Sequence, residues 1–285
     1  MLATRAAVVQ LRATPDARHS LGRALHWTQA ALERGAELVL LPENYAGIPP
    51  AGEPSEIQAE ADDLSRCPAI APWLELPRHV TYVLGGLPVR AGQRRQNTCV
   101  VVHRGAVAAT YAKVHLFDGV MPDGRRLGET DKVERGEELV AVDGPWGRLG
   151  LSICYDLRFP ELYRAYAEAG ATLLAAPSAF TFPTGAAHWE LLLRARAVEN
   201  QAFVLAPAQW GVHAEGRHSW GRSMIVDPWG DVVVNVGTGE GIGVADLEPA
   251  ALARARNAVP SLRHRVLSAE TSVRTVTLAG SDGQA

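Results

Sequence analysis

Cysteine is scarce in this sequence. Its 285 residues include only three cysteines, Cys67, Cys99 and Cys154. An odd number at wide spacings is not the disulfide framework of a small secreted domain, so a reducing compartment is the simpler expectation. The N-terminus shows no apolar segment followed by a cleavage site, and no run approaches the roughly 18 apolar residues of a membrane span. We therefore expect a soluble, cytoplasmic protein.

Positive charge is not in excess either. The formal net charge is -3, and the arginines are scattered among acidic residues. Proteins that bind nucleic acids usually gather a basic excess on one face, so we expect neither a nucleic acid nor a membrane as a partner. The nine histidines form no HExxH pattern, and no CxxC pair is present. A metal hydrolase is therefore disfavoured, and we expect no metal and no cofactor.

The sequence also lacks internal repeats, low-complexity linkers and composition breaks. Short β-like runs alternate with helix-like stretches, and several β-like runs follow one another directly, which predicts an α/β protein with mixed sheets covered by helices. We expect one domain over residues 1–260 and a C-terminal arm over residues 261–285. The predicted strands are 6–11, 37–41, 81–89, 98–103, 107–111, 150–154, 171–176, 201–206, 223–226, 232–236 and 242–247. The predicted helices are 20–34, 56–76, 160–168 and 188–199. We expect residues 114–138 to form a long functional loop.

The most informative segment surrounds Cys154, in GLSICYDLRFPE. A predicted strand ends at this cysteine, and Pro160 stands at a plausible first position of a helix. Such a corner exposes the thiol and points the following backbone N–H groups at whatever the sulfur attacks. A nearby helix start also adds partial positive charge, which helps to hold a thiolate. A lone cysteine at a strand end is more often a small buried hydrophobe, and we interpret Cys67 and Cys99 in that way.

A nucleophilic thiol needs a base or a nearby cation. Glu43 follows an apolar run and a proline in LPENY, and Lys113 follows a predicted strand in TYAKVHLFD. Both lie far from Cys154 in the sequence, so only the fold can bring the three together. Taken singly, a charged residue at a strand end is usually solvated.

Taken together, these segments resemble the nitrilase superfamily. LPENY, YAKVHLFD and GLSICYDLRFPELYR occur in that family's order, and further similar segments are GET at 128–130, the stretch 188–200 and MIVDPWG at 224–230. The resemblance covers about residues 4–250 and points to the Nit branch, whose members are amidases. It implies a four-layer αββα sandwich that forms a homodimer or a higher homo-oligomer through its helices.

The resemblance also implies a Glu–Lys–Cys catalytic set. Glu43 would take the proton of Cys154 and later pass it to the leaving amine. The thiolate would attack the amide carbonyl to form an acyl-enzyme, ammonia would leave, and water would release the acid. Lys113 and the backbone N–H of Tyr155 would stabilise the oxyanion, while Glu129 would hold Lys113 and the substrate amide in place.

The expected substrate is a small carboxylate-bearing amide, of the deaminated glutathione or omega-amide kind. Arg158 is the candidate clamp for a carboxylate, although an ion pair with Asp156 or Glu161 is an equally open interpretation. The other residues expected to contact the substrate are Tyr45, Tyr155, Phe180 and Thr184.

Several alternatives stay open at this point. An N-carbamoyl amide hydrolase or a nitrilase of the same superfamily would use the same residues, and an inactive scaffold would share only the fold. A papain-like arrangement would instead pair Cys154 with His188 and Asn200. The glycine-rich segment 237–243 does not fit the GxGxxG spacing of a nucleotide-binding loop, and we expect a hairpin turn there.

Overall fold

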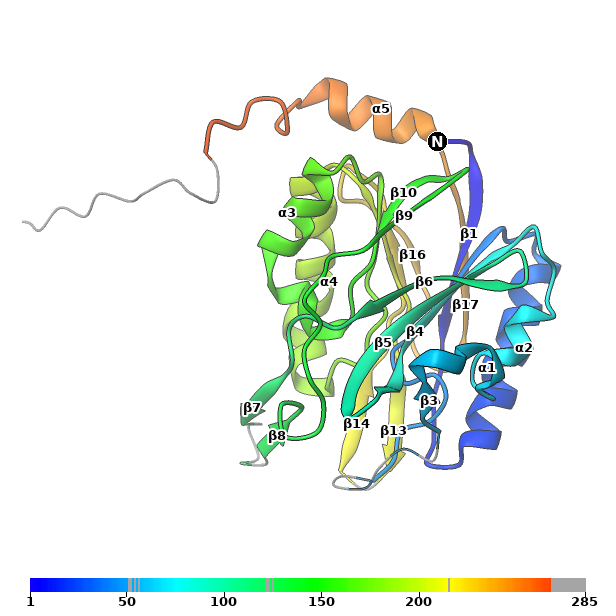
Figure 1. Cartoon of the computed structure of the whole chain (residues 1–285). Helices are drawn as coiled ribbons and strands as arrows, with labels where there is room; N and C mark the ends of the chain where they lie inside the picture. Colours follow the sequence, from blue (N-terminus) through cyan, green and yellow to red (C-terminus); the bar gives the residue numbers. More distant parts are fainter. Residues whose placement is uncertain are drawn as a thin grey trace, which may run out of the picture.

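Two mixed β-sheets lie at the centre of the fold (Figure 1). The computed structural model describes residues 1–50, 53, 55, 57–120, 124, 126–214 and 216–267. The first sheet has the order β17-β1-β2-β4-β5-β6, with the short β3 beside β4; β2 runs parallel to β1 and β4, and β5, β6 and β17 pair antiparallel. Its strands are β1 (Thr4–Gln10), β2 (Leu38–Leu41), β3 (Ala59–Glu60), β4 (Thr81–Ala91), β5 (Arg94–His103), β6 (Ala106–Ala112) and β17 (Gly241–Leu247).

The second sheet repeats the plan of a parallel centre with antiparallel flanks. Its order is β16-β15-β12-β11-β10-β9, with β10, β11 and β12 parallel. Its strands are β9 (Ala141–Gly144), β10 (Gly147–Gly150), β11 (Leu173–Ala175), β12 (Phe203–Ala206), β15 (Met224–Val226) and β16 (Val232–Asn235). Two hairpins stand outside the sheets: β7 (Asp118–Val120) with β8 (Arg126–Gly128), and β13 (Trp210–Ala214) with β14 (Arg217–Trp220).

Helices cover the outer face of each sheet. On the first sheet lie α1 (Ala17–Glu33), the 3-10 turn η1 (Ala61–Arg66) and α2 (Ala71–Leu74); on the second lie α3 (Pro160–Glu168) and α4 (Phe182–Asn200). The inner faces of both sheets meet in one apolar core, in which Val8 and Leu40 of the first sheet pack with Leu173 and Leu205 of the second. Because both faces of each sheet are covered, the strands β2, β11 and β12 are wholly buried and apolar. The predicted α/β fold, a four-layer αββα sandwich, is confirmed.

Several predicted boundaries move. The helix expected from residue 20 begins at Ala17, because the Asp16 side chain accepts a hydrogen bond from the His19 N–H and caps it. The helix expected over 188–199 already begins at Phe182, with a proline in its first turn. The stretch 56–76, expected to be one broken helix, contains β3, η1 and α2.

Three predictions about strands and turns are wrong in detail. The strand expected over 150–154 ends at Gly150, so Cys154 instead opens the 3-10 turn η2 (Cys154–Arg158). Residues 237–243 do not form a hairpin turn, since β16 and β17 belong to different sheets and this segment crosses between them. The hairpin β13–β14 was not expected, and the segment expected to be a loop at 114–138 contains β7 and β8.

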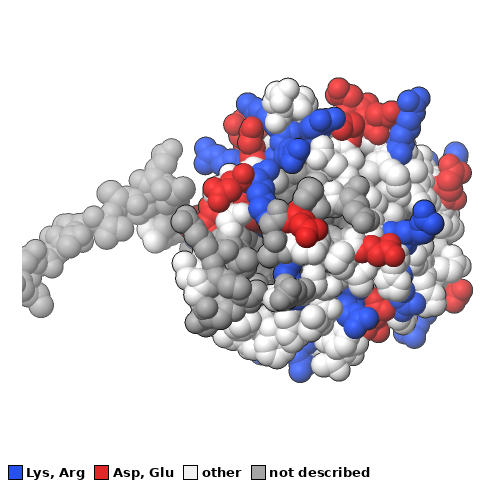
Figure 2. All heavy atoms as spheres, turned by 90° about the horizontal axis from the view of Figure 1, so that it is seen from below, with Lys and Arg blue, Asp and Glu red and all other residues white. Residues whose placement is uncertain are grey.

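The C-terminal ends of the parallel strands lie at one end of the molecule. In Figure 1 the hairpins β7–β8 and β13–β14 gather at the lower end, whereas α5 (Pro249–Ala258) crosses the upper end. Figure 2 views the lower end, where basic and acidic side chains are interspersed among the drawn residues. Of the expected arm, residues 268–285 lie outside the described part of the chain. In that described part, no helix is long and apolar enough to cross a bilayer.

Candidate active site

Glu43, Lys113 and Glu129 meet at the lower end of the sandwich. Glu43 lies just after β2, Lys113 just after β6, and Glu129 just after β8. The Lys113 Nζ lies 3.3 Å from Glu43 Oε1, and 2.9 and 2.7 Å from the two carboxylate oxygens of Glu129. The structure therefore brings together two strand ends and a hairpin that are distant in sequence, as the candidate set requires.

Both carboxylate oxygens of Glu43 are fixed by donors. The Asn97 Nδ2 donates to Oε1 at 2.8 Å, and the backbone N–H of Ala179 donates to Oε2 at 3.1 Å. The Gln209 side chain donates to the Glu43 backbone carbonyl at 3.0 Å. Close packing beside Asn97 requires glycine at position 86, since a Cβ there would lie 2.0 Å from Asn97 Oδ1. Glu43 is thus held in one orientation, which is what a general base needs.

Lys113 is almost completely buried, yet it stays charged. Burial alone would lower its pKa, but the carboxylates of Glu43 and Glu129 together outweigh burial and raise it above its ordinary value. Burial also raises the pKa of Glu129. Lys113 and the Phe117 backbone N–H favour the charged carboxylate and so offset part of this increase. The site therefore holds a permanent cation between two carboxylates.

Cys154 is brought to the same place from the second sheet. Its backbone N–H donates to the Pro177 carbonyl at 2.9 Å, and its φ of 48° lies in the left-handed region. Such a conformation is costly for a residue with a side chain and marks a strained corner. Two residues after Pro177, the Ala179 backbone N–H donates to Glu43 Oε2, so this short segment after β11 connects the cysteine turn to the glutamate.

The electrostatics favour a neutral thiol at rest. Burial raises the pKa of Cys154 well above its ordinary value, and the negative charge of Glu43 raises it further. Lys113 and the Ala179 N–H act in the opposite direction but do not prevail. A thiol of this kind becomes nucleophilic only when a base removes its proton, and Glu43 is the carboxylate whose charge acts most strongly on the thiol.

Arg158 lies among aromatic rings rather than in an ion pair. Its guanidinium carbon is 5.8 Å from the ring centre of Tyr155 and 5.1 Å from that of Phe180, and its Nη1 lies 3.2 Å from His188 Nδ1. Within the described residues it forms no ion pair with Asp156 or Glu161. Its charge thus remains available to an anionic ligand. Thr184 bonds to Thr181 at the start of α4, 2.8 Å between the hydroxyls.

Tyr45 does not belong with these residues. Its side chain has no exposed surface, packs edge-on against Trp73 under α1, and donates from its hydroxyl to the Ala69 carbonyl at 2.7 Å. The prediction that Tyr45 contacts the substrate is therefore wrong. Sequence position suggested proximity to Glu43, but the turn after β2 points the ring into the core.

The papain-like alternative finds no support in the geometry. Asn200 is fully buried at the end of α4, where its Nδ2 donates to the Arg196 carbonyl. His188 is exposed and contacts Arg158.

Three polar residues near the site were not predicted. Asn97 holds Glu43, and Asp156 is fully buried directly behind the cysteine turn. Arg217 of β14 donates to the Pro49 carbonyl at 3.0 Å, and burial lowers its pKa while Glu43 and Glu129 raise it. The sequence gave no signal for Arg217, because the hairpin that carries it was not expected.

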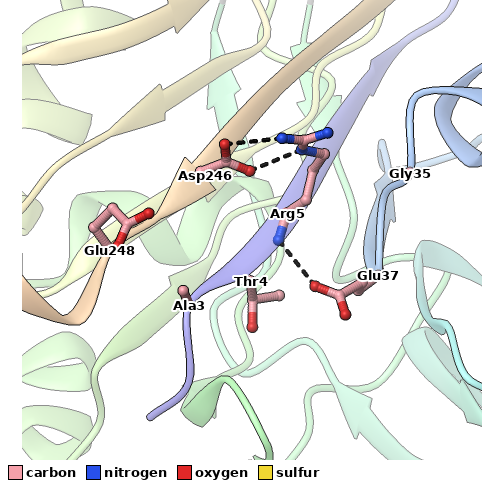
Figure 3. Close-up of a pocket in the computed structure, with 7 residues that line it drawn as sticks. All are labelled: Ala3, Thr4, Arg5, Gly35, Glu37, Asp246 and Glu248. Atoms are coloured by element: carbon pink, nitrogen blue, oxygen red, sulfur yellow. Dashed lines mark hydrogen bonds and ion pairs between the residues drawn. The ribbon is translucent and has the colours of Figure 1, made fainter.

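A second hollow lies at the opposite end of the first sheet. This cavity of about 230 Å³ is shown in Figure 3, where the Arg5 guanidinium pairs with Asp246 and the Arg5 backbone N–H donates to Glu37. It contains no nucleophile or buried charge. No group of three or more histidine, cysteine or acidic side chains suited to a metal ion occurs in the described ranges.

Comparison with known proteins identifies the family. A family model for carbon-nitrogen hydrolases matches residues 5–257. This chain belongs to the carbon-nitrogen hydrolase family.

The relatives of this hydrolase include amidases and members of the nitrilase superfamily. It is 40% identical over 270 residues to a deaminated glutathione amidase of Synechocystis sp., covering 92% of this chain and 97% of that protein. The crystal structure of the Caenorhabditis elegans NitFhit protein matches with a TM-score of 0.84 and 39% identity, over 93% of this chain and 65% of that one. Nit3 of Saccharomyces cerevisiae, a member of branch 10 of the nitrilase superfamily, matches with a TM-score of 0.79 and 31% identity, over 90% and 94%. The predicted superfamily and Nit branch are confirmed, and the enzyme is an amidase acting on carbon–nitrogen bonds.

Proposed function

We propose that this hydrolase is a thiol amidase that cleaves small carboxylate-bearing amides through an acyl-enzyme on Cys154. The observation that carries the proposal is the segment after β11, which connects the cysteine turn to the glutamate. Its Pro177 carbonyl accepts from the Cys154 backbone N–H at 2.9 Å, its Ala179 N–H donates to Glu43 at 3.1 Å, and Lys113 lies 3.3 Å from the same carboxylate. A thiol, a fixed base and a buried cation in this arrangement suit acyl transfer.

The first step forms the acyl-enzyme. Glu43 accepts the thiol proton as the Cys154 sulfur attacks the amide carbon, which converts the carbonyl oxygen into an oxyanion. Lys113 and the backbone N–H of Tyr155 stabilise that oxyanion. Glu129 keeps Lys113 in place through both of its oxygens. Glu43 then gives the proton to the nitrogen, and the carbon–nitrogen bond breaks.

The second step regenerates the thiol. Glu43 removes a proton from water, the hydroxide attacks the thioester carbon, and the carbon–sulfur bond breaks as the thiolate regains its proton. The product is a carboxylic acid. A primary amide releases ammonia, whereas the secondary amide of deaminated glutathione releases the amine of the dipeptide cysteinylglycine.

The substrate class follows from the cations near the thiol. Arg158 lies over Tyr155 and Phe180 without an ion-pair partner among the described residues, and a carboxylate would complete its hydrogen bonds. Arg217 carries a second half-buried guanidinium, and the charges of Glu43 and Glu129 act to raise its pKa. A relative with 40% identity is a deaminated glutathione amidase, so we propose an amide with one or two carboxylates.

We also propose a homodimer formed through α4. Leu191 and Val198 on this helix are 68% and 50% exposed, and seven residues apart they lie on the same face of the helix. A second copy would cover them. Replacing Leu191 by aspartate should give monomers in light scattering, and an unchanged mass would contradict this interface. The cytoplasmic location and the division at residue 260 stay predictions.

The substrate experiment compares three proteins. Wild type, Cys154→Ala and Cys99→Ala are incubated with deaminated glutathione and with alpha-ketoglutaramate, and the acid and amine products are quantified. Cys99→Ala removes a buried thiol of β5 and is the matched control. We expect turnover in wild type and Cys99→Ala and none in Cys154→Ala.

The outcomes separate the open alternatives. Preference for the first amide supports a dicarboxylate site, and preference for the second supports an omega-amide site. No turnover of either, with Cys154 still alkylated by iodoacetamide, would overturn the substrate class and direct the test to carbamoyl amides and nitriles. An unreactive Cys154 in folded protein would indicate an inactive scaffold.

A further inference from the structure

Asp156 is a buried carboxylate that the catalytic steps above do not use. It has no exposed surface, although it lies two residues after the candidate nucleophile. Burying an ionised carboxylate is costly unless donors surround it, so its hydrogen bonds must account for its position. Those donors lie at the end of β6 in the first sheet, in the residues that follow it, and in the segment that follows β10 of the second sheet.

The four donors lie next to the two catalytic segments. On one side, Asp156 Oδ2 accepts from the Ile153 backbone N–H at 2.9 Å, directly before Cys154. On the other, Oδ2 accepts from the Tyr111 hydroxyl at 2.7 Å, and Oδ1 accepts from the backbone N–H and Nδ1 of His115 at 2.9 and 2.8 Å. A carboxylate can only accept, so His115 carries its proton on Nδ1 in this pair.

These contacts fall on both sides of Lys113 in the sequence. Tyr111 lies in β6, two residues before Lys113. Its hydroxyl also accepts a hydrogen bond from the Val114 N–H at 3.4 Å. His115 follows Lys113 by two residues, and its ring stacks on Phe159 at 3.6 Å. One carboxylate thus links the lysine segment of the first sheet with the cysteine turn of the second.

We infer that Asp156 is a positioning residue that sets the distance between Lys113 and Cys154. The inference rests on the proposed function, because it assumes that these two residues act on one substrate carbonyl. Hydrogen bonds to a buried charge are short, strong and directional, so four of them restrict both segments. A displacement of about 1 Å between reacting groups can cost roughly 100-fold in rate.

The test measures acylation of Cys154 by p-nitrophenyl acetate, followed as the burst of p-nitrophenol in the full chain. This readout does not depend on the physiological amide, and Cys154→Ala supplies the blank. Absence of any Cys154-dependent release of p-nitrophenol by wild type, burst or steady state, would contradict the proposed function itself. With release by wild type, the variants Asp156→Asn, Tyr111→Phe, His115→Ala and His115→Asn test the positioning role.

We expect Asp156→Asn to lower the acylation rate roughly 100-fold at saturating ester, with little change in the half-saturating concentration. Tyr111→Phe and His115→Ala remove one donor each and should lower it about 10-fold. His115→Asn keeps a side-chain donor near the Nδ1 position and should recover most of the loss. Rates are expressed per folded, titrated Cys154.

The matched control is Tyr82→Phe. This buried tyrosine of β4 donates to the Pro77 carbonyl, away from the cysteine turn, so its loss should change stability without changing the rate. If Asp156→Asn does not fold, the acylation rates of Tyr111→Phe, His115→Ala and His115→Asn test the inference without it. Wild-type rates in these variants, equal losses in Tyr82→Phe, or no recovery in His115→Asn would each overturn the inference.

Discussion

The two ends of the first sheet carry the same kinds of charge in opposite surroundings. At the upper end, Arg5 pairs with Asp246 at 2.8 Å, and the two side chains are 47% and 49% exposed. At the lower end, Lys113 and Glu43 are only 1% and 4% exposed. Water screens the first pair, which leaves its contribution to stability small. The buried Lys113–Glu43 pair has no water that could replace a lost partner, so each of its charges is stabilised only by neighbouring protein groups.

This difference explains why only the lower end can perform chemistry. Charges that are fixed and desolvated need no reorganisation when a reaction develops charge beside them. The upper cavity has no thiol, and its paired Arg5 and Asp246 side chains are about half exposed to solvent (Figure 3). Substitutions that treat both ends alike should therefore give unlike results.

The largest expected difference concerns the two glutamates. Glu43→Gln removes the base and should lower kcat by roughly 100- to 10,000-fold. Glu37→Gln, which changes an acceptor of the Arg5 backbone N–H, should leave kcat unchanged. Steady-state turnover of the preferred amide measures both. Retention of more than about a tenth of wild-type turnover in Glu43→Gln would remove it from the role of base.

The next difference concerns the two cations. Lys113→Met leaves the buried Glu43 and the partly exposed Glu129 without their counter-charge and should lower the free energy of unfolding by about 3–5 kcal/mol. Arg5→Met should produce no resolvable change, since its partners are solvated. Urea unfolding curves measure both variants. Equal effects at the two ends would show that burial does not set the strength of these pairs.

A smaller difference should appear in the pH dependence of Cys154. Burial and the charge of Glu43 both raise the pKa of the thiol, so alkylation by iodoacetamide should rise only in the alkaline range. Glu43→Gln removes one of these causes, and the midpoint should move to lower pH. Glu37→Gln provides the control with no shift. A midpoint that moves upward in Glu43→Gln would reverse the electrostatic interpretation.

The smallest effect is expected at Tyr45. Tyr45→Phe loses a buried hydrogen bond to Ala69 and should lower the free energy of unfolding by about 1 kcal/mol. The ratio kcat/KM should remain at the wild-type value, because no part of the ring is exposed to a ligand. Thermal unfolding and steady-state kinetics measure the two quantities. A large rise in KM alone would restore Tyr45 to substrate binding.

Local sequence signals explain which elements were predicted well. The helix Pro160–Glu168 was predicted with its observed bounds, because a proline at the first position fixes its start. The strand before Cys154 was extended four residues too far, since Leu151 and Ile153 are apolar and buried but no longer belong to a paired strand of the sheet. Whether an apolar run pairs depends on neighbours that the run itself does not reveal.

The sequence by itself determined the class of chemistry. A cysteine at a sharp corner and a glutamate and a lysine that each follow a strand are local patterns, and their segments LPENY, YAKVHLFD and GLSICYDLRFPELYR resemble the nitrilase superfamily, whose members are thiol hydrolases. The tertiary structure decided how these residues act. Only the packing of two sheets brings Lys113 between Glu43 and Glu129, turns Tyr45 into the core and buries Asp156 between both catalytic segments. Distances, burial and donor geometry arise from contacts between segments remote in the chain, and local sequence carries no record of them.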